Sequence, residues 1–129
     1  MYRQKFKSYG EVVICSDAGG NWRKKVFPQY KASRKKTRDK SSVDWTEVFR
    51  ITSMIREEIR ENFPYRFMYV ENCEADDIIA ILTQHAYILA PNEKVLIVSG
   101  DKDFQQLHKY DNVKPVSYTH LTLPTICSV

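Results

Sequence analysis

The chain has 129 residues, of which 43% are hydrophobic and 28% are charged, a balance typical of a soluble globular domain that excludes a wholly disordered chain. No apolar run approaches the roughly 20 residues that span a bilayer, and no apolar signal core follows the N-terminus, so we expect a cytoplasmic protein without membrane attachment. The net charge of +4 is uneven, because nine basic and one acidic residue give Trp22 to Lys40 a charge of +8 and leave −4 for the rest.

The first part of the chain predicts a helix end, a strand and a basic segment. Residues 2–9 resemble the end of a helix, and residues 11–16 form a nearly continuous apolar run that predicts a strand buried on both faces. Asp17 follows this strand directly. The basic segment comes next, and Pro28 is expected to interrupt any long helix within it. A cluster of cations suits phosphate groups, although a merely solvated loop would show the same pattern.

The middle of the chain predicts a long amphipathic helix and a second strand. Asp44 with Glu47 three residues later resembles a capping box, and apolar residues recur at helical spacing behind it. We therefore expect a helix over residues 44–62 that ends before Pro64. Residues 67–70 are apolar and predict the second strand.

The last part repeats the alternation of helix and strand. Residues 75–89 predict a helix with Ile78 on its inward face, and the apolar run 94–99 predicts a third strand. A short helix is expected after the turn at residues 101–103. Strands that alternate with helices predict an α/β fold in which helices sandwich a parallel sheet.

The stretch from Val116 to Val129 follows none of these patterns. Its amino-acid sequence resembles the translation of a sequencing adapter. We therefore expect residues 116–129 to be a non-native tail and residues 1–115 to form the domain. The three cysteines, Cys15, Cys73 and Cys127, are scattered without the spacing of a zinc site or a disulfide framework.

Three groups of carboxylates occur, and each lies where a predicted strand ends or a helix begins. Because the carboxyl ends of parallel strands lie along one edge of a sheet, we expect these acids to converge there. Close carboxylates repel unless cations neutralise them, and hard oxygen ligands suit Mg²⁺ or Mn²⁺. For any single acid, capping of a helix is the simpler interpretation. The candidate metal ligands are Asp17, Glu74, Asp76, Asp77, Asp101 and Asp103.

Four segments together resemble the 5′-3′ exonuclease/flap endonuclease family. They are Asp17 after a strand, Trp22 to Arg34 with the run Tyr30-Lys31-Ala32-Ser33-Arg34, Glu74-Ala75-Asp76-Asp77, and Gly100 to Leu107. The run from Leu107 to Lys114 is similar to the ribonuclease H branch found in T-even phages, which would place the protein in the host cytoplasm. The resemblance implies a PIN-like or resolvase-like N-terminal domain with a basic helical arch over about residues 20–43.

The resemblance also implies the roles of single residues. Asp17, Glu74, Asp76 and Asp101 would surround the first metal ion, and Asp103 would lie on the side of the second. Two Mg²⁺ ions, with Mn²⁺ as a substitute, would support phosphodiester hydrolysis. Lys31 and Arg34 would contact phosphates beside the scissile bond. The full set of expected nucleic-acid contacts is Arg23, Lys24, Tyr30, Lys31, Arg34 and Lys35.

Family members carry further features that this sequence lacks. An earlier strand ending in Asp and a downstream acid beside a DNA-gripping helical motif are both missing, so we expect an internal piece that is inactive alone. The implied substrates are DNA with a 5′ flap or nick and RNA–DNA hybrid primers during replication. A single-strand-binding protein or a clamp is a candidate partner, and a monomer is expected.

Two other functions are compatible with the residues. A PIN-like ribonuclease would place its acids similarly, but it would lack a long basic arch. A non-catalytic nucleic-acid-binding fragment would use the acids as helix caps only. Metal-dependent cleavage of a flap or an RNA-primed duplex separates these alternatives from a nuclease of the resembling family.

Overall fold

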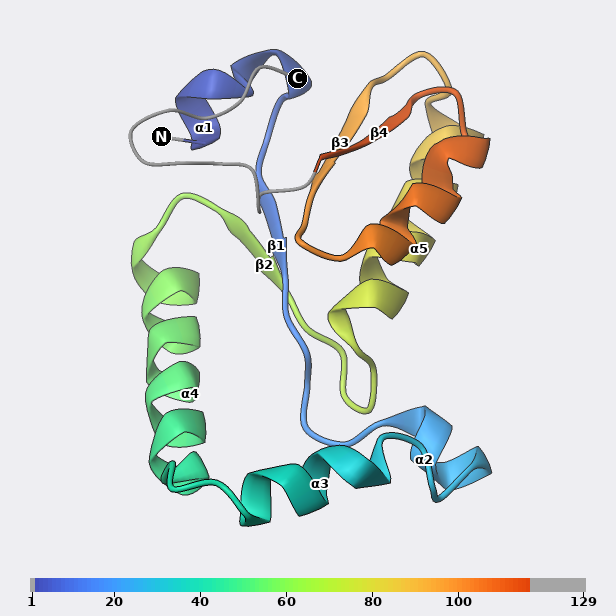
Figure 1. The fold of residues 1–129 in the computed structure, drawn as a ribbon. Coiled ribbons are helices and arrows are strands. Elements are labelled where there is room, and N and C mark those ends of the chain that lie inside the picture. The colour runs from blue at the N-terminus through green and yellow to red at the C-terminus, as the bar shows by residue number, and fades with distance from the viewer. Residues whose placement is uncertain (1, 117–129) are drawn as a thin grey trace. The chain divides into compact units, whose positions relative to one another are not determined.

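The computed structural model of the chain describes residues 2–116 (Figure 1). The chain divides into two compact units, one formed by Glu11–Ile78 and the other by Met1–Gly10 together with Ile79–Val129. Of the tail predicted at residues 116–129, the part from residue 117 onwards lies outside the described residues. The two units are described in turn.

The unit Glu11–Ile78 contains a pair of parallel strands. Strand β1 (Val13–Cys15) pairs with β2 (Arg66–Met68), with Ile14 opposite Phe67. The backbone N–H of Ser16, the residue after β1, donates to the carbonyl oxygen of Met68 at the end of β2 at 3.0 Å. The prediction that β1 is buried on both faces is wrong, because Val13 is 42% exposed. Its partner strand β2 pairs along one edge of β1, whereas burial of both faces needs helices packed on each of them.

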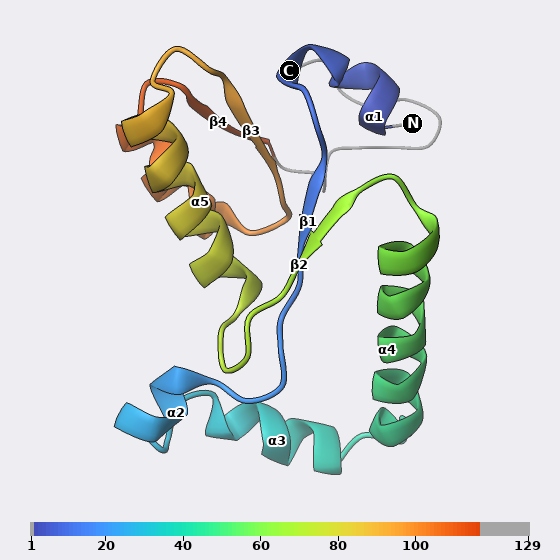
Figure 2. The same ribbon diagram turned by 180° about the vertical axis from the view of Figure 1, so that it is seen from behind.

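Two short helices carry the basic segment. Helix α2 (Trp22–Val26) begins after Asn21, whose side chain accepts a hydrogen bond from the N–H of Arg23 at 2.9 Å. Helix α3 (Ala32–Asp39) follows after a turn that contains Pro28. The predicted interruption of the basic segment is thus confirmed. Figure 2 shows α2 where the chain leaves β1, and α3 on the way to the next helix.

Helix α4 (Trp45–Asn62) lies within one residue of the predicted range. The Asp44 side chain caps it by accepting a hydrogen bond from the N–H of Glu47 at 3.1 Å. The apolar residues of this predicted amphipathic helix are not covered in the described structure, since no residue of α4 is buried and Phe49 is 51% exposed. Eighteen helical residues span about 27 Å, whereas a strand of three residues spans about 10 Å, so the strand pair is too short to cover the helix.

Helix α5 (Ala75–Leu89) occupies its predicted range and passes from one unit into the other. Its Ile78 is 5% exposed, as the periodicity predicted. Thr83 is more deeply buried still, at 2% exposure, and the apolar pattern alone did not indicate it. Among residues 2–116, no helix combines the length and the apolar character needed to cross a membrane.

The other unit begins with helix α1 (Tyr2–Lys5) and the 3-10 helix η1 (Lys7–Tyr9). It also contains a second parallel pair, β3 (Val95–Val98) with β4 (Val113–Val116). The 3-10 helix η2 (Lys102–Lys109) connects these two strands.

The core of this unit lies between its two strands and η2. It consists of Ile97, Phe104 and Val113, which are 6–7% exposed. Strand β4 was not predicted, because Pro115 disrupts the strand pattern. The predicted α/β class with parallel strands is confirmed in both pairs.

Candidate functional site

The loops that follow β1 and β2 are joined to each other by backbone hydrogen bonds. The N–H of Ala18 donates to the carbonyl of Cys73 at 3.2 Å, and the N–H of Trp22 donates to the carbonyl of Asn72 at 2.8 Å. The N–H of Asn72 in turn donates to the carbonyl of Gly19 at 3.3 Å. Because parallel strands end at the same edge, the two loops meet there and bring together acids that are far apart in the sequence.

Asp17 caps helix α5 from the other loop. One of its carboxylate oxygens accepts a hydrogen bond from the backbone N–H of Ala75 at 2.7 Å. The first N–H groups of a helix have no partner within the helix, so a carboxylate is favourable at this place. The second oxygen, Oδ2, accepts no hydrogen bond from any residue of the described part of the chain. Asp17 is exposed and keeps one oxygen available for a further ligand.

Asp77 is bound by the beginning of the basic segment. The Arg23 guanidinium holds both of its oxygens, with Nη1 to Oδ2 at 2.8 Å and Nη2 to Oδ1 at 2.6 Å. The indole Nε1–H of Trp22 and the backbone N–H of Glu74 also donate to Oδ2, at 3.2 and 3.0 Å. The hydrogen bonds from Arg23 lower the pKa of Asp77 to about 2, against a smaller opposing effect of burial. Asp77 therefore stays ionised at neutral pH.

Glu74 is held by cations of the basic segment as well. Lys31 Nζ forms an ion pair with Oε1, and the Tyr30 hydroxyl donates to Oε2 at 3.0 Å. Arg23 Nη1 approaches Oε2 at 3.3 Å. Burial acts to raise the pKa of Glu74, but the hydrogen bonds from Lys31 and Tyr30 outweigh it and the pKa is lowered. Glu74 also raises the pKa of Lys31 through their shared hydrogen bond.

The structure thus pairs residues for which the sequence predicted separate partners. Arg23, Tyr30 and Lys31 were expected to contact phosphates, and Glu74 and Asp77 were expected to bind metal ions. In the structure these five side chains contact one another, and we call this set the clasp. The members of the clasp are partly buried, with exposed side-chain fractions of 15% for the two acids and 29% for Arg23 and Lys31.

Other predicted cations remain in water. Lys24 lies in α2, and Arg34 and Lys35 lie in α3. All three side chains are exposed, and none forms an ion pair with any residue between 2 and 116. They are therefore free to contact a phosphate backbone.

Asp76 lies in the first turn of α5, next to Asp77, and is exposed. Asp101 and Asp103 belong to the other unit, where they follow β3. One oxygen of Asp101 caps η2 by accepting a hydrogen bond from the N–H of Asp103 at 2.8 Å. The backbone N–H of Asp101 donates in turn to Ser99 Oγ at 3.1 Å.

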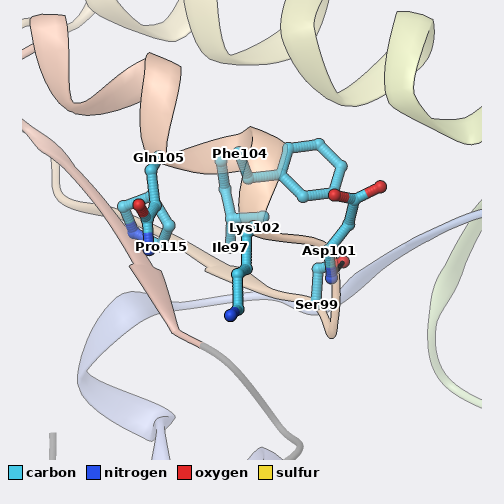
Figure 3. Close-up of a pocket in the computed structure, with 7 residues that line it drawn as sticks. All are labelled: Ile97, Ser99, Asp101, Lys102, Phe104, Gln105 and Pro115. Atoms are coloured by element: carbon cyan, nitrogen blue, oxygen red, sulfur yellow. Dashed lines mark hydrogen bonds between the residues drawn. The ribbon is translucent and has the colours of Figure 1, made fainter.

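A small cavity of about 40 Å³ lies beside Asp101, at the end of β3 (Figure 3). This volume corresponds to about three water molecules, so the cavity is too small for a nucleotide. Figure 3 shows the Asp101 and Lys102 side chains extending in different directions. The lining residues are Ile97, Ser99, Asp101, Lys102, Phe104, Gln105 and Pro115.

The acids differ in how well they suit a divalent metal ion. Three acids suit Mg²⁺, which prefers oxygen ligands: Asp17, Asp101 and Asp103. Each is exposed, and each has at least one carboxylate oxygen that accepts no hydrogen bond from the described residues. Asp77 suits a metal ion less well, because Arg23 pairs with both of its oxygens and Oδ2 accepts two further hydrogen bonds. Within residues 2–116, no three His, Cys, Asp or Glu side chains are placed to hold a metal ion together. The convergence of all six acids stays a prediction, since they belong to two units.

Two residues of this region were not identified from the sequence. Asn72 has a left-handed backbone with φ of 62°, and both its N–H and its carbonyl connect the loops. Arg56 of α4 donates to the backbone carbonyl of Asp17 at 3.1 Å and lies 5.6 Å from the centre of the Tyr69 ring. An asparagine in a turn was a signal for Asn72, because asparagine tolerates positive φ. Nothing in the local pattern indicated Arg56.

A family profile described as the 5′-3′ exonuclease, N-terminal resolvase-like domain matches residues 1–126. Among curated proteins, ribonuclease H of Enterobacteria phage T4 is 38% identical over 120 residues, which cover 92% of this chain. The match to DNA polymerase I of Lactococcus lactis subsp. cremoris is 38% identical over 97 residues and covers 74% of this chain. A 5′-3′ exonuclease of Buchnera aphidicola subsp. Acyrthosiphon pisum is 30% identical over 105 residues, or 81% of this chain.

The chain spans only part of each of these relatives. It corresponds to 39% of the length of the phage protein, 33% of the Buchnera exonuclease and 10% of the polymerase. The part of the chain that the family profile matches includes both loops after β1 and β2 and all members of the clasp.

Proposed function

Since the chain belongs to the family of 5′-3′ exonuclease N-terminal, resolvase-like domains, we propose that it forms part of a metal-dependent nuclease that hydrolyses phosphodiester bonds. The proposed reaction is that of a 5′-3′ exonuclease or 5′-flap endonuclease with ribonuclease H-like activity, which removes primers during DNA replication. The substrates are DNA with a 5′ flap or nick and RNA–DNA hybrid primers.

One observation in the structure carries this proposal. The loops after two parallel strands hold Asp17 and the segment Glu74 to Asp77 at one strand end, directly beside the start of the basic segment. A nuclease needs acids that hold cations and bases that hold phosphates within reach of each other. The protein makes this juxtaposition with residues that lie more than fifty positions apart.

We propose Asp17, Asp76, Asp101 and Asp103 as ligands of two Mg²⁺ ions, which Mn²⁺ can replace. When bound, such ions make a coordinated water acidic enough to attack a phosphodiester and stabilise the leaving oxygen. Glu74 would join them only by giving up its ion pair with Lys31.

The basic segment supplies the contacts to the nucleic acid. Lys24, Arg34 and Lys35 extend into water from α2 and α3, where each can neutralise one phosphate. Lys31, when released from Glu74, would add a further cation. Each neutralised phosphate releases counterions, so binding should weaken steeply with rising salt.

Cleavage of defined substrates tests this proposal. A 5′-flap DNA and an RNA-primed duplex, each labelled at the 5′ end, are incubated with the nuclease of which we propose this chain to be a part. We expect cleavage with Mg²⁺ or Mn²⁺ and none with EDTA. Asp101→Asn and Asp103→Asn are expected to abolish cleavage but to retain binding. If both variants cut at the rate of the unaltered protein, the assignment of the metal ligands is wrong.

A non-catalytic nucleic-acid-binding module is the second candidate. The observation in its favour is that Asp17 and Asp101 each accept a hydrogen bond from a helical N–H, as pure caps would. In that case no divalent ion would produce cleavage, while binding to the same substrates would persist.

A further inference from the structure

Asp77 is the most fully hydrogen-bonded acid of the site. Its carboxylate accepts four hydrogen bonds, two from Arg23, one from the Trp22 indole and one from the backbone N–H of Glu74. Three of the four reach Oδ2, and Oδ1 pairs with Arg23 Nη2, so the guanidinium already neutralises this carboxylate at both oxygens. Asp17, by contrast, accepts one such hydrogen bond and is exposed.

The side-chain partners of Asp77 are the first two residues of the basic segment. Trp22 and Arg23 open helix α2, and both contact Asp77 across more than fifty residues of sequence. The Arg23 guanidinium also lies 4.6 Å from the centre of the Trp22 ring and 5.8 Å from that of Tyr30. Both of its Nη atoms are used by acids of the clasp.

The planar fork of arginine matches a carboxylate at two points, which fixes direction as well as distance. A single ammonium group could not orient α2 in this way. Because α2 leads into the turn and into α3, the two-point contact of Arg23, together with the backbone hydrogen bond from Trp22 to Asn72, sets the direction in which the basic segment begins. Lys24, Arg34 and Lys35 form no ion pair in the described structure. Arg23 holds the start of their segment, and the contacts of Tyr30 and Lys31 with Glu74 hold it before α3.

We propose that Asp77 is a positioning residue and not a metal ligand: it anchors Trp22 and Arg23, and with them the basic segment, to the loop before α5. The role of the anchored segment in binding nucleic acid rests on the proposed function. Arg23 then acts on substrate binding indirectly, by fixing the orientation of the basic segment. The exposed cations that follow it in the sequence contact the phosphates.

The test compares Asp77→Asn with Glu11→Gln in the 129-residue chain. Both variants remove one carboxylate that is paired with an arginine of the same unit, and both raise the net charge by one. The control pair, Glu11 with Arg66, is 74% exposed on both sides and lies outside the clasp. Arg23→Lys is a second test variant, because lysine keeps the charge but cannot make the two-point contact.

The first measurement follows the indole N–H resonances of the two tryptophans by NMR. Asp77→Asn is expected to shift the Trp22 signal and to leave that of Trp45, which donates to Ser41 Oγ at 2.7 Å. The second measurement is the affinity for 5′-flap DNA in EDTA at fixed salt. Here we expect a loss of at least about threefold for Asp77→Asn and Arg23→Lys, but none for Glu11→Gln. An added positive charge alone would tighten binding, so the direction of the change separates positioning from charge.

The third measurement is binding of Mn²⁺ alone by calorimetry. Asp77→Asn is expected to bind Mn²⁺ like the unaltered chain. The inference is overturned if Asp77→Asn loses Mn²⁺ affinity as Asp17→Asn does, or if its flap affinity and Trp22 signal match those of Glu11→Gln. If the unaltered chain binds no flap DNA, the proposed function fails instead, and the Trp22 signal still decides whether Asp77 holds the helix.

Discussion

Replacing Gly20 by alanine is expected to destabilise the junction between the loops after β1 and β2. Gly20 has a φ of +81°, and a Cβ atom added there would lie 2.6 Å from Asn72 Oδ1. The neighbouring Gly19 has open space around such an atom. Gly19→Ala is therefore a matched control one residue away.

The size of the effect follows from backbone strain and from the contact. A residue with a Cβ atom in the left-handed region costs about 1–2 kcal/mol. Moving the Asn72 side chain out of the way adds about 1 kcal/mol, the cost of an unfavourable rotamer. Gly19→Ala should change the stability by less than about 1 kcal/mol, in the stabilising direction, because alanine restricts the unfolded chain. We thus expect the two variants to differ by about 2–3 kcal/mol.

Urea unfolding followed by tryptophan fluorescence measures this difference. Trp22 and Trp45 both belong to the unit Glu11–Ile78, so the signal reports on the unit that contains the substitutions. Gly20→Ala should also weaken 5′-flap binding, because the N–H of Trp22 donates to Asn72 at this junction. Equal unfolding free energies for the two alanine variants would refute the role of the left-handed turn.

Three further predictions concern single side chains. Asp44→Ala should remove about 1 kcal/mol of stability from α4; faster hydrogen exchange at the first amides of the helix would reveal it. The lowered pKa of Asp77, about 2, means that its stabilising contribution is complete above pH 4 and is lost as the pH falls towards 2. As the pH is lowered from 5 to 2, the melting temperature of Asp77→Asn should therefore fall less steeply than that of the unaltered chain. Parallel curves of melting temperature against pH for the two proteins would argue against the Arg23 ion pair. Arg34→Ala should reduce the slope of log K against log salt for flap binding by about 1 without changing the melting temperature; an unchanged slope would exclude a phosphate contact.

Local signals in the sequence predicted the secondary structure well where they were complete within a few residues. Asp44 and Pro64 bracket α4, and the periodicity around Ile78 predicted α5. Strand β4 was not predicted, because it is short, contains Pro115 and is defined by its pairing with β3. The burial of β1 was overestimated because an apolar run does not show how many elements are available to cover it.

The candidate acids and bases could be found from their types and from the order of the motifs, but their partners could not. The sequence offered Asp77 as a metal ligand and Arg23 as a phosphate contact, and each interpretation is reasonable for an isolated residue. In the structure these two side chains form a two-point ion pair across 54 positions.

The sequence by itself therefore determined which segments are helices and strands, which family the motifs resemble, and which residue types are present for chemistry. Only the tertiary structure decided which charge faces which. The physical reason is that the parallel pairing of β1 and β2 brings two loops that are distant in the sequence to the same end of the strand pair. Several acids and bases of similar kind meet there, and short-range hydrogen-bond geometry determines which of them pair.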